Sequence, residues 1–144
     1  MMQPSSLLKF PLFSGFSEEQ IENILPLMTE EEFDPDDIII TEGKTNDKVY
    51  FILKGKVTIT RKNAFLACFC EGESFGEMEV LDVMLSSASV KALSHVIAKS
   101  LSNRALRAIY NIDVKTFSLI ILNIARELTK RVRKMDEQLA SLSR

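Results

Sequence analysis

The chain has 144 residues, of which 46% are hydrophobic and 26% are charged, and its formal net charge is −2. This length and composition suit one folded domain with a hydrophobic core, and the acidic balance disfavours a general nucleic-acid surface, which needs a positive face. The sequence has no run of about 18 apolar residues, and Met1–Phe10 lacks the features of a signal peptide. We therefore expect no membrane span and a cytoplasmic location.

The first predicted element is a helix from about residue 17 to residue 28. Ser17 and Gln20 have the spacing of a capping box, in which each side chain accepts a hydrogen bond from the other residue's backbone N–H. Ile21, Ile24 and Leu25 would lie on one face of this helix. That apolar face is expected to pack on the core.

Between residues 31 and 101 the sequence changes to short apolar runs that are separated by turn residues. These runs predict strands at Ile38–Ile40, Val49–Leu53, Val57–Thr60, Ala64–Cys70, Ala88–Leu93 and Val96–Leu101. Because their close spacing leaves no room for helices between strands, the pattern favours an antiparallel barrel or jelly roll over a parallel α/β sheet.

Two cysteines, Cys68 and Cys70, lie in the fourth of these runs. Residues two apart in a strand point to the same face of the sheet. A zinc site would need more ligands than the nearby sequence offers, so we interpret both as buried free thiols.

Two helices are predicted after the strands, a short one at Asn103–Asn111 and a long one that starts at about Asp113 and continues to the end. Apolar residues recur in the long helix at alternating spacings of four and three: Ile121, Ala125, Leu128, Val132, Met135, Leu139 and Leu142. The part that holds Phe117, Ile120, Ile121 and Ile124 is expected to cover the chain's own core. A helix of about 30 residues is roughly 45 Å long, however, and its far half would stay exposed without a partner. We therefore predict a homodimer through this helix.

Residues 72–90 carry the strongest functional signal. The segment Phe75-Gly76-Glu77-Met78 follows Gly72, and Ser86-Ser87-Ala88-Ser89 comes before Val90. A glycine that opens a short helix lets an anion approach the unpaired backbone N–H groups of the first turn. Glu77 would then be free to accept hydrogen bonds from sugar hydroxyls. A simple turn that leads into a helix remains the alternative interpretation of the first half of this segment.

Phe75–Glu77 together with Ser87–Val90 resembles the phosphate-binding cassette of cyclic-nucleotide-binding domains, the effector domains of the catabolite-activator type. The resemblance extends over about residues 10–135 and includes Pro11–Glu19 and Val49–Val57. It implies a mainly β fold, an antiparallel β-roll or jelly-roll barrel of about eight strands with an N-terminal helix and C-terminal helices.

The same resemblance implies one stand-alone domain, residues 1–144, with a helical segment at 1–29, the β-roll at 30–102, and lid and dimer helices at 103–144. In such a domain Gly76 and the next N–H groups would face the cyclic phosphate of cyclic AMP or cyclic GMP. Glu77 would face the ribose hydroxyl, Ser87 the phosphate or base, and Arg131 on the lid helix the base. We predict no cofactor, metal ligand or catalytic residue, and a ligand-binding set of Phe75, Gly76, Glu77, Met78, Ser86, Ser87, Ala88, Ser89 and Arg131.

The sequence departs from the family pattern at two notable positions. Asp36 stands where a glycine is usual before the second strand. Ser86 stands where the family has the arginine that pairs with the cyclic phosphate, and loss of such a charge-assisted bond weakens binding by roughly ten- to more than a hundredfold. Lys91 is a candidate replacement cation, with a solvated lysine as the simpler interpretation.

Three functions follow from these observations. The first is a regulatory module in which a bound cyclic mononucleotide, or another anionic small molecule, shifts the lid helix. The second is a ligand-free, dimeric interaction module whose pocket is filled by side chains such as Met78, Met84 or Leu85. The third, an enzyme, is disfavoured because His95 is the only histidine and no nucleophile–base set can be assembled.

The family often places a DNA-binding helix-turn-helix after the lid helix. This sequence ends at Arg144, so we expect no direct nucleic-acid contact. The output would then pass to an unidentified protein partner, with the long C-terminal helix as the contact surface.

Overall fold

The computed structural model describes residues 4–143, and its first quarter is mainly helical. The segments are α1 (Pro4–Leu7), η1 (Pro11–Phe13), α2 (Glu18–Ile24) and η2 (Leu25–Leu27). The capping box at the start of α2 is confirmed, because the Gln20 N–H donates to Ser17 Oγ over 3.1 Å and the Ser17 N–H donates to Gln20 Oε1 over 2.9 Å. The α-helix ends four residues earlier than predicted, since Pro26 has no N–H to continue it.

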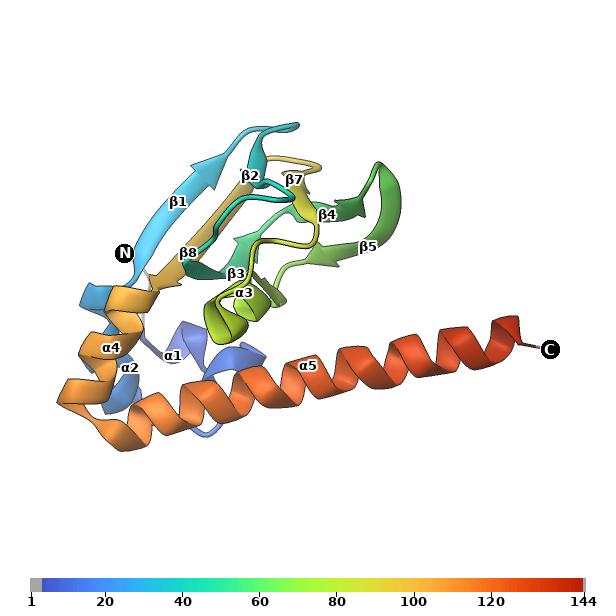
Figure 1. Cartoon of the computed structure of the whole chain (residues 1–144). Coiled ribbons are helices and arrows are strands. Elements are labelled where there is room, and N and C mark those ends of the chain that lie inside the picture. Colours follow the sequence, from blue (N-terminus) through green and yellow to red (C-terminus); the bar gives the residue numbers. More distant parts are fainter. Residues whose placement is uncertain (1–3, 144) are drawn as a thin grey trace.

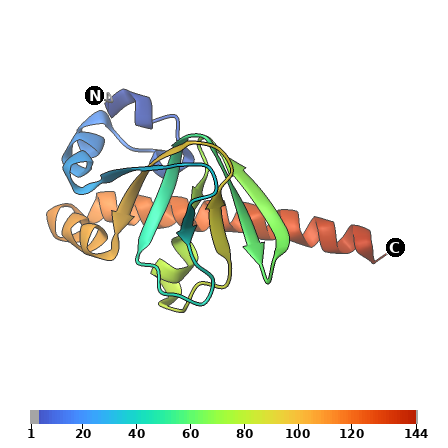
Figure 2. The same cartoon turned by 90° about the horizontal axis from the view of Figure 1, so that it is seen from above.

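Eight antiparallel strands follow in the described chain and form two four-stranded sheets. They are β1 (Thr29–Phe33), β2 (Ile38–Ile40), β3 (Lys48–Lys54), β4 (Lys56–Arg61), β5 (Ala64–Cys70), β6 (Ser74–Phe75), β7 (Ser89–Ala92) and β8 (Val96–Ser102). One sheet has the order β1-β8-β3-β6 and the other β2-β7-β4-β5. The jelly-roll class is confirmed, but the closed barrel is not, because the strands divide into two separate sheets (Figures 1 and 2).

A hydrophobic core lies between the two sheets. It combines residues of both, among them Tyr50, Ile52 and Ala98 from the first and Val57 and Val90 from the second. In the second sheet Val57 lies opposite both Phe69 of β5 and Ala92 of β7. This register turns the apolar positions of neighbouring strands to the same inner face.

The six strands predicted from apolar runs are all present, as β2, β3, β4, β5, β7 and β8. The two missed strands are β1 and β6. The strand β1 holds three consecutive glutamates, Glu30–Glu32, and lies at a sheet edge, where one side faces solvent and apolar alternation is not required. The strand β6 has only two residues, too few for any periodicity.

The prediction that Cys68 and Cys70 are buried is wrong, because both thiols are exposed. They lie on β5, an edge strand, and alternate with Phe69, which packs on the core between the sheets. The Cys70 thiol bonds the Glu73 carboxylate over 3.4 Å, and this hydrogen bond raises the pKa of Cys70. Both thiols therefore face outward.

Asp36, which replaces a usual glycine, adopts the left-handed backbone conformation with φ +75°. Its N–H donates to the Ala92 carbonyl over 2.8 Å, and the Asp34 N–H donates to the Asp37 side chain over 2.8 Å. Aspartate tolerates this conformation better than most residues with a side chain. The departure at Asp36 therefore leaves the turn between β1 and β2 intact.

Two helices complete the chain, α4 (Asn103–Ile112) and α5 (Val114–Leu142), with Asp113 as the N-cap of α5, as predicted. Ile120 and Ile124 are buried against the N-terminal helices, and Phe117 packs beside them. The Asn123 side chain donates to the carbonyls of Leu12 and Ser14, each over 2.9 Å, and so ties α5 to η1.

The helix α5 passes under the sheets and projects beyond them (Figure 1). Val132, Met135, Leu139 and Leu142 are exposed on this projecting part, as the sequence predicted for a helix without a partner. Within residues 4–143, no helix has the length and apolar content needed to cross a membrane. Residues 1–3 and 144, which the single-domain prediction includes, lie outside the described part.

The burial of α5 leads to a test of its packing. Ile124 is 1% exposed and Leu122, two residues earlier, is 45% exposed. We expect Ile124→Ala to lower the free energy of unfolding by about 2–5 kcal/mol, because it leaves a cavity in the helical core. Leu122→Ala is the matched control and should cost less than about 1 kcal/mol. Urea denaturation followed by circular dichroism measures both, and equal losses would contradict this placement of α5.

Candidate functional site

The short helix α3 (Glu77–Asp82) opens at Gly76, directly after β6, as the cassette pattern predicted. Gly76 has φ +88°, and a Cβ at this position would overlap the Lys48 carbonyl oxygen. No side chain caps the first turn of α3. Only glycine therefore fits the close approach between α3 and β3.

Glu77 is a buried carboxylate, 2% exposed, at the first position of α3. Ser74 Oγ donates to it over 2.5 Å, and Arg131 Nη1 of α5 lies 3.4 Å from the same carboxylate oxygen. Arg131 Nη2 also donates to the Ser74 carbonyl, and its guanidinium lies 4.3 Å from the centre of the Phe69 ring. We call these contacts of Arg131 with Glu77, Ser74 and Phe69 the Arg131 clasp.

The Arg131 clasp joins the long helix to the cassette across 54 residues of sequence. A buried carboxylate without a counter-charge is strongly destabilising, and Arg131 supplies that charge here. The planar guanidinium also suits the face of Phe69. The helix α5 is therefore held on the cassette by a charged contact.

Ser86 is buried, 6% exposed, and lies in the second half of the cassette. Its hydroxyl donates to the Ala88 carbonyl over 2.6 Å, and its own N–H donates to the Lys44 carbonyl over 2.8 Å. Its carbonyl accepts from the Gly43 N–H over 2.8 Å. Ser86 therefore fastens the cassette to the loop between β2 and β3, and its hydroxyl is occupied within the protein.

The loop between β2 and β3 also holds the beginning of α3. Asn46 donates to the carbonyls of Gly76, over 3.2 Å, and Lys48, over 2.9 Å, and to the Glu79 carboxylate over 3.3 Å. Burial raises the pKa of Glu79, and the Asn46 bond partly offsets this effect. Asn46 was missed by sequence reasoning, because nothing in its local pattern connects it to a helix 30 residues later.

Ser74 was missed as well, although a signal was available. Ser74 and Glu77 have the Ser-x-x-Glu spacing that often marks a helix start. In the structure the two side chains bond each other directly rather than the backbone. The Ser-x-x-Glu spacing therefore marks a real contact, which joins the two side chains and does not cap the helix.

Phe75 is buried in the hydrophobic core between the two sheets. Its ring stacks on Tyr50 with a centroid distance of 4.9 Å and an interplanar angle of 11°. Burial and the nearby charges of Glu31 and Asp47 raise the pKa of Tyr50 to about 12. Phe75 is therefore buried in the core, directly before the glycine that opens α3.

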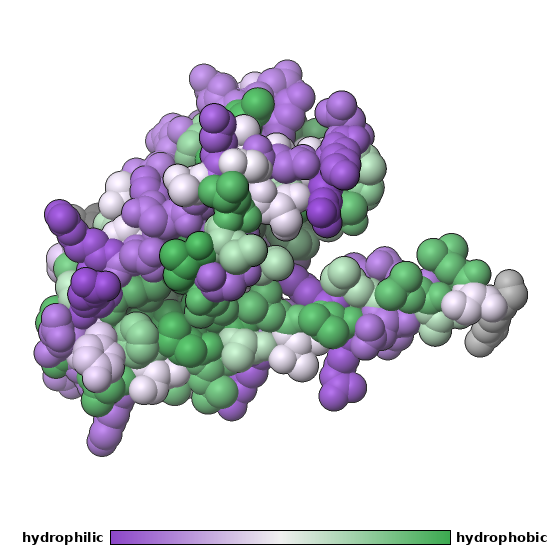
Figure 3. All heavy atoms as spheres, in the orientation of Figure 1, coloured by the Kyte–Doolittle hydropathy of each residue, from purple (hydrophilic) through white to green (hydrophobic). Residues whose placement is uncertain are grey.

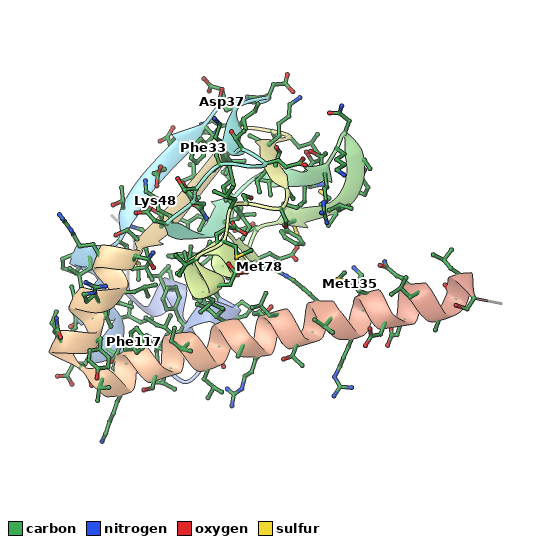
Figure 4. All side chains as sticks on the ribbon, viewed as in Figure 1. Phe33, Asp37, Lys48, Met78, Phe117 and Met135 are labelled. Carbon is green, nitrogen blue, oxygen red and sulfur yellow. The ribbon has the colours of Figure 1, made fainter. Side chains whose placement is uncertain are left out.

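The remaining predicted site residues make none of the contacts of the Arg131 clasp. Ser89 Oγ accepts from the Glu42 N–H over 2.9 Å, Ala88 is half-buried, and Ser87 is exposed. Met78 is exposed on α3 (Figure 4). The structure therefore brings Glu77 and Arg131 together and leaves Ser87 open to solvent.

Two of the alternatives raised by the sequence are wrong. Met78, Met84 and Leu85 do not fill a pocket, because all three are exposed and contribute to the apolar surface around α3 in Figure 3. Lys91 does not serve the cassette, since its ammonium lies 3.5 Å from Asp36 at an exposed position.

Two hollows border α5 away from the Arg131 clasp. The larger, about 640 Å³, lies between the N-terminal segment and α5. The smaller, about 550 Å³, lies between α3, α4 and α5.

His95 is exposed and bonds Glu32 over 3.2 Å. Among the described residues, no three or more His, Cys, Asp or Glu side chains gather closely enough to hold a metal ion.

The order of elements and the geometry at Gly76 have a counterpart among known families. The family model of the cyclic nucleotide-binding domain matches residues 30–113, more than half of the chain. The chain belongs to this family.

Two relatives match the chain over longer or separate alignments, a receptor protein and a channel. The chain is 29% identical to the cyclic AMP receptor protein of Thermus thermophilus over 138 residues, which cover 92% of this chain and 62% of that protein. It is 34% identical to the human potassium/sodium hyperpolarization-activated cyclic nucleotide-gated channel 4 over 92 residues, which cover 64% of this chain and 8% of the channel. The chain thus spans less than two thirds of the length of these relatives.

A solved cyclic nucleotide-binding domain from Methylobacillus flagellatus has the same fold. The two structures superpose with a TM-score of 0.85 at 25% sequence identity, over 96% of this chain and 80% of the other. The jelly roll, its entry helices and its terminal helices are therefore those of the cyclic nucleotide-binding domain family.

The glycine that opens the cassette of this family member can be tested against a matched control. Gly76 and Gly43 both have left-handed backbones, φ +88° and +83°, but a Cβ on Gly43 would meet no atom within 4 Å. We expect Gly43→Ala to cost about 1–2 kcal/mol of unfolding free energy from backbone strain. Gly76→Ala should cost at least about 1–3 kcal/mol more, because the Lys48 backbone cannot move away. Chemical denaturation compares the two, and similar costs would argue against the tight α3–β3 contact.

Proposed function

We propose that the chain is a single regulatory module that binds a cyclic mononucleotide, cyclic AMP or cyclic GMP, at the cassette between Gly72 and Ser89. Binding would shift α5. The observation that carries this proposal is the Arg131 clasp, which links the buried Glu77 of the cassette to the helix that would act as the lid. Membership of the cyclic nucleotide-binding domain family supports the choice of ligand.

The chemistry of the cassette fits a ribonucleotide. Glu77 is an acceptor whose Arg131 contact is 3.4 Å long, so a ribose hydroxyl that donates to the carboxylate could replace the guanidinium. The first turn of α3 follows Gly76, where no side chain blocks the backbone N–H groups. An anionic group bound next to the ribose would meet those donors.

The same contacts explain how the ligand would act. A ligand changes a conformational equilibrium only if it prefers one state. Because Glu77 is held by Arg131 before binding, a ribose hydroxyl that takes over Glu77 releases one contact of α5. The position of α5 would therefore differ between the free and the bound module.

A second candidate function is a ligand-free interaction module of the same fold. Two observations favour it: Ser86 brings no cation to the cassette, and Arg131 already satisfies Glu77. In that case the Arg131 clasp would be permanent, and the projecting part of α5 would carry the function alone.

We propose in addition that two copies pair through α5. Val132, Met135, Leu139 and Leu142 continue the apolar stripe of Leu128 at spacings of four and three, and all four are exposed. Figure 3 shows this hydrophobic surface on the part of α5 that projects beyond the sheets. A second α5 would cover it, and a protein partner of the dimer would receive the signal.

Calorimetry with cyclic AMP and cyclic GMP tests the ligand. The wild-type chain should bind at least one of them with a dissociation constant of about millimolar or tighter. Ser86→Arg should strengthen binding by roughly ten- to a hundredfold, because it adds a charge-assisted bond to the phosphate. Lys91→Gln, which removes an exposed lysine that pairs with Asp36, is the control and should change nothing. If neither the wild type nor Ser86→Arg binds either nucleotide, the ligand-free module is correct.

Light scattering tests the dimer. The double variant Met135→Asp/Leu139→Asp places two charges on side chains that are 59% and 60% exposed, so it should leave the fold intact and halve the molecular mass. The matched control, Lys134→Asp/Ser141→Asp, changes two exposed residues on the opposite side of α5 and should keep the mass of the dimer. A wild-type chain that already has the mass of one copy would remove the proposal.

A further inference from the structure

The cassette contains no cation of its own. Residues 72–90 hold four acidic residues, Glu73, Glu77, Glu79 and Asp82, and no lysine or arginine. An anionic ligand would therefore enter a segment whose own charge is negative. Such a ligand needs a positive group from another part of the chain.

Two lysines on the neighbouring strands β3 and β7 are engaged elsewhere. Lys48 lies 3.4 Å from Glu31, and Lys91 lies 3.5 Å from Asp36. Among the ion pairs of the described residues, the one that reaches the cassette is Arg131 with Glu77. Arg131 is thus a cation whose side chain already contacts the cassette.

The guanidinium of Arg131 can serve a second anion. It carries five N–H groups, more than the Glu77 carboxylate and the Ser74 carbonyl use. Its 3.4 and 3.5 Å contacts with Glu77 are long for a charge-assisted bond, which leaves room to reorient. The ring of Phe69, 4.3 Å away, supports the guanidinium from one face while it turns.

We propose that Arg131 supplies the counter-charge for the phosphate of the cyclic nucleotide, in place of residue 86; this inference rests on the proposed function. The ribose hydroxyl donates to Glu77, and the guanidinium turns on the Phe69 ring until it also reaches the phosphate. In the bound site the guanidinium then lies between two anions, the Glu77 carboxylate and the phosphate. Because Arg131 belongs to α5, its contact with the phosphate would also determine the position of the lid helix.

This arrangement defines what the site selects. A ligand must offer a hydroxyl donor for Glu77 and an anion for Arg131 at neighbouring positions, as a cyclic ribonucleotide does. In this arrangement Arg131 contacts the phosphate and not the base, which differs from the role that the family resemblance implied for it. Cyclic AMP and cyclic GMP share the sugar and phosphate, so the contribution of Arg131 should be the same for both.

The test is calorimetry of the full chain with cyclic AMP and cyclic GMP. Arg131→Gln should weaken binding of both nucleotides by the same factor, roughly ten- to more than a hundredfold. Arg131→Lys should weaken both by a smaller, equal factor, because lysine keeps the charge but loses the planar fork. Arg133→Gln removes an exposed arginine two residues along the same helix and should change neither affinity. Ser86→Arg/Arg131→Gln should recover binding.

Each other outcome has a defined meaning. Unchanged or tighter binding by Arg131→Gln would overturn the inference, since Arg131 would then be a spectator or a block. If Arg131→Gln weakens the binding of only one nucleotide, Arg131 contacts the base, and this result would also overturn the inference. A wild type that does not bind while Ser86→Arg does would refute the role of Arg131 but keep the cassette. If neither the wild type nor Ser86→Arg binds a nucleotide, the proposed function itself is wrong. If Arg131→Gln fails to fold by circular dichroism, Arg131→Lys decides, and unchanged affinities would overturn the inference.

Discussion

The fold is organised around one ion pair, between the buried Glu77 at the start of α3 and the partly buried Arg131 of α5. Removal of the Arg131 charge would leave the Glu77 carboxylate buried without a counter-charge, which costs more than the pair contributes. The pair therefore constrains two elements at once: α3 must open at Gly76, and α5 must pass beneath it. Ser74 and Phe69 complete the environment of the guanidinium from two further strands.

The rest of the structure positions this pair. The two sheets hold Phe75 and Tyr50 stacked between them, so that the chain leaves the core at Gly76. The loop between β2 and β3 fastens both ends of the cassette, through Asn46 near α3 and through the backbone bonds of Ser86. The proposed regulatory role uses this combination of a cassette that is held at both ends and a helix that is joined to it through Arg131.

Sequence reasoning succeeded where local patterns decide the structure. The capping box at Ser17 and the six strands with apolar runs depend on neighbouring residues alone. It failed where the place of an element in the fold decides which residues are buried. The strand β1 is polar because it lies at an edge, and Cys68 is exposed because it lies on the outer face of the edge strand β5. Likewise the contacts of Arg131 with Glu77 join positions 54 residues apart, and no periodicity predicts which of several basic residues on a helix turns inward.

Asn123 has a consequence for any motion of the last helix. Its amide anchors α5 to the carbonyls of Leu12 and Ser14, so the first third of the helix stays with the N-terminal segment. Displacement is confined to the stretch from there to Leu142, an arm of roughly 28 Å at 1.5 Å per residue. A bend of about 10° near this pivot would move the helix by about 2 Å at Arg131 and by about 5 Å at its tip, so a small adjustment beside the cassette becomes a movement nearly as wide as one helical turn.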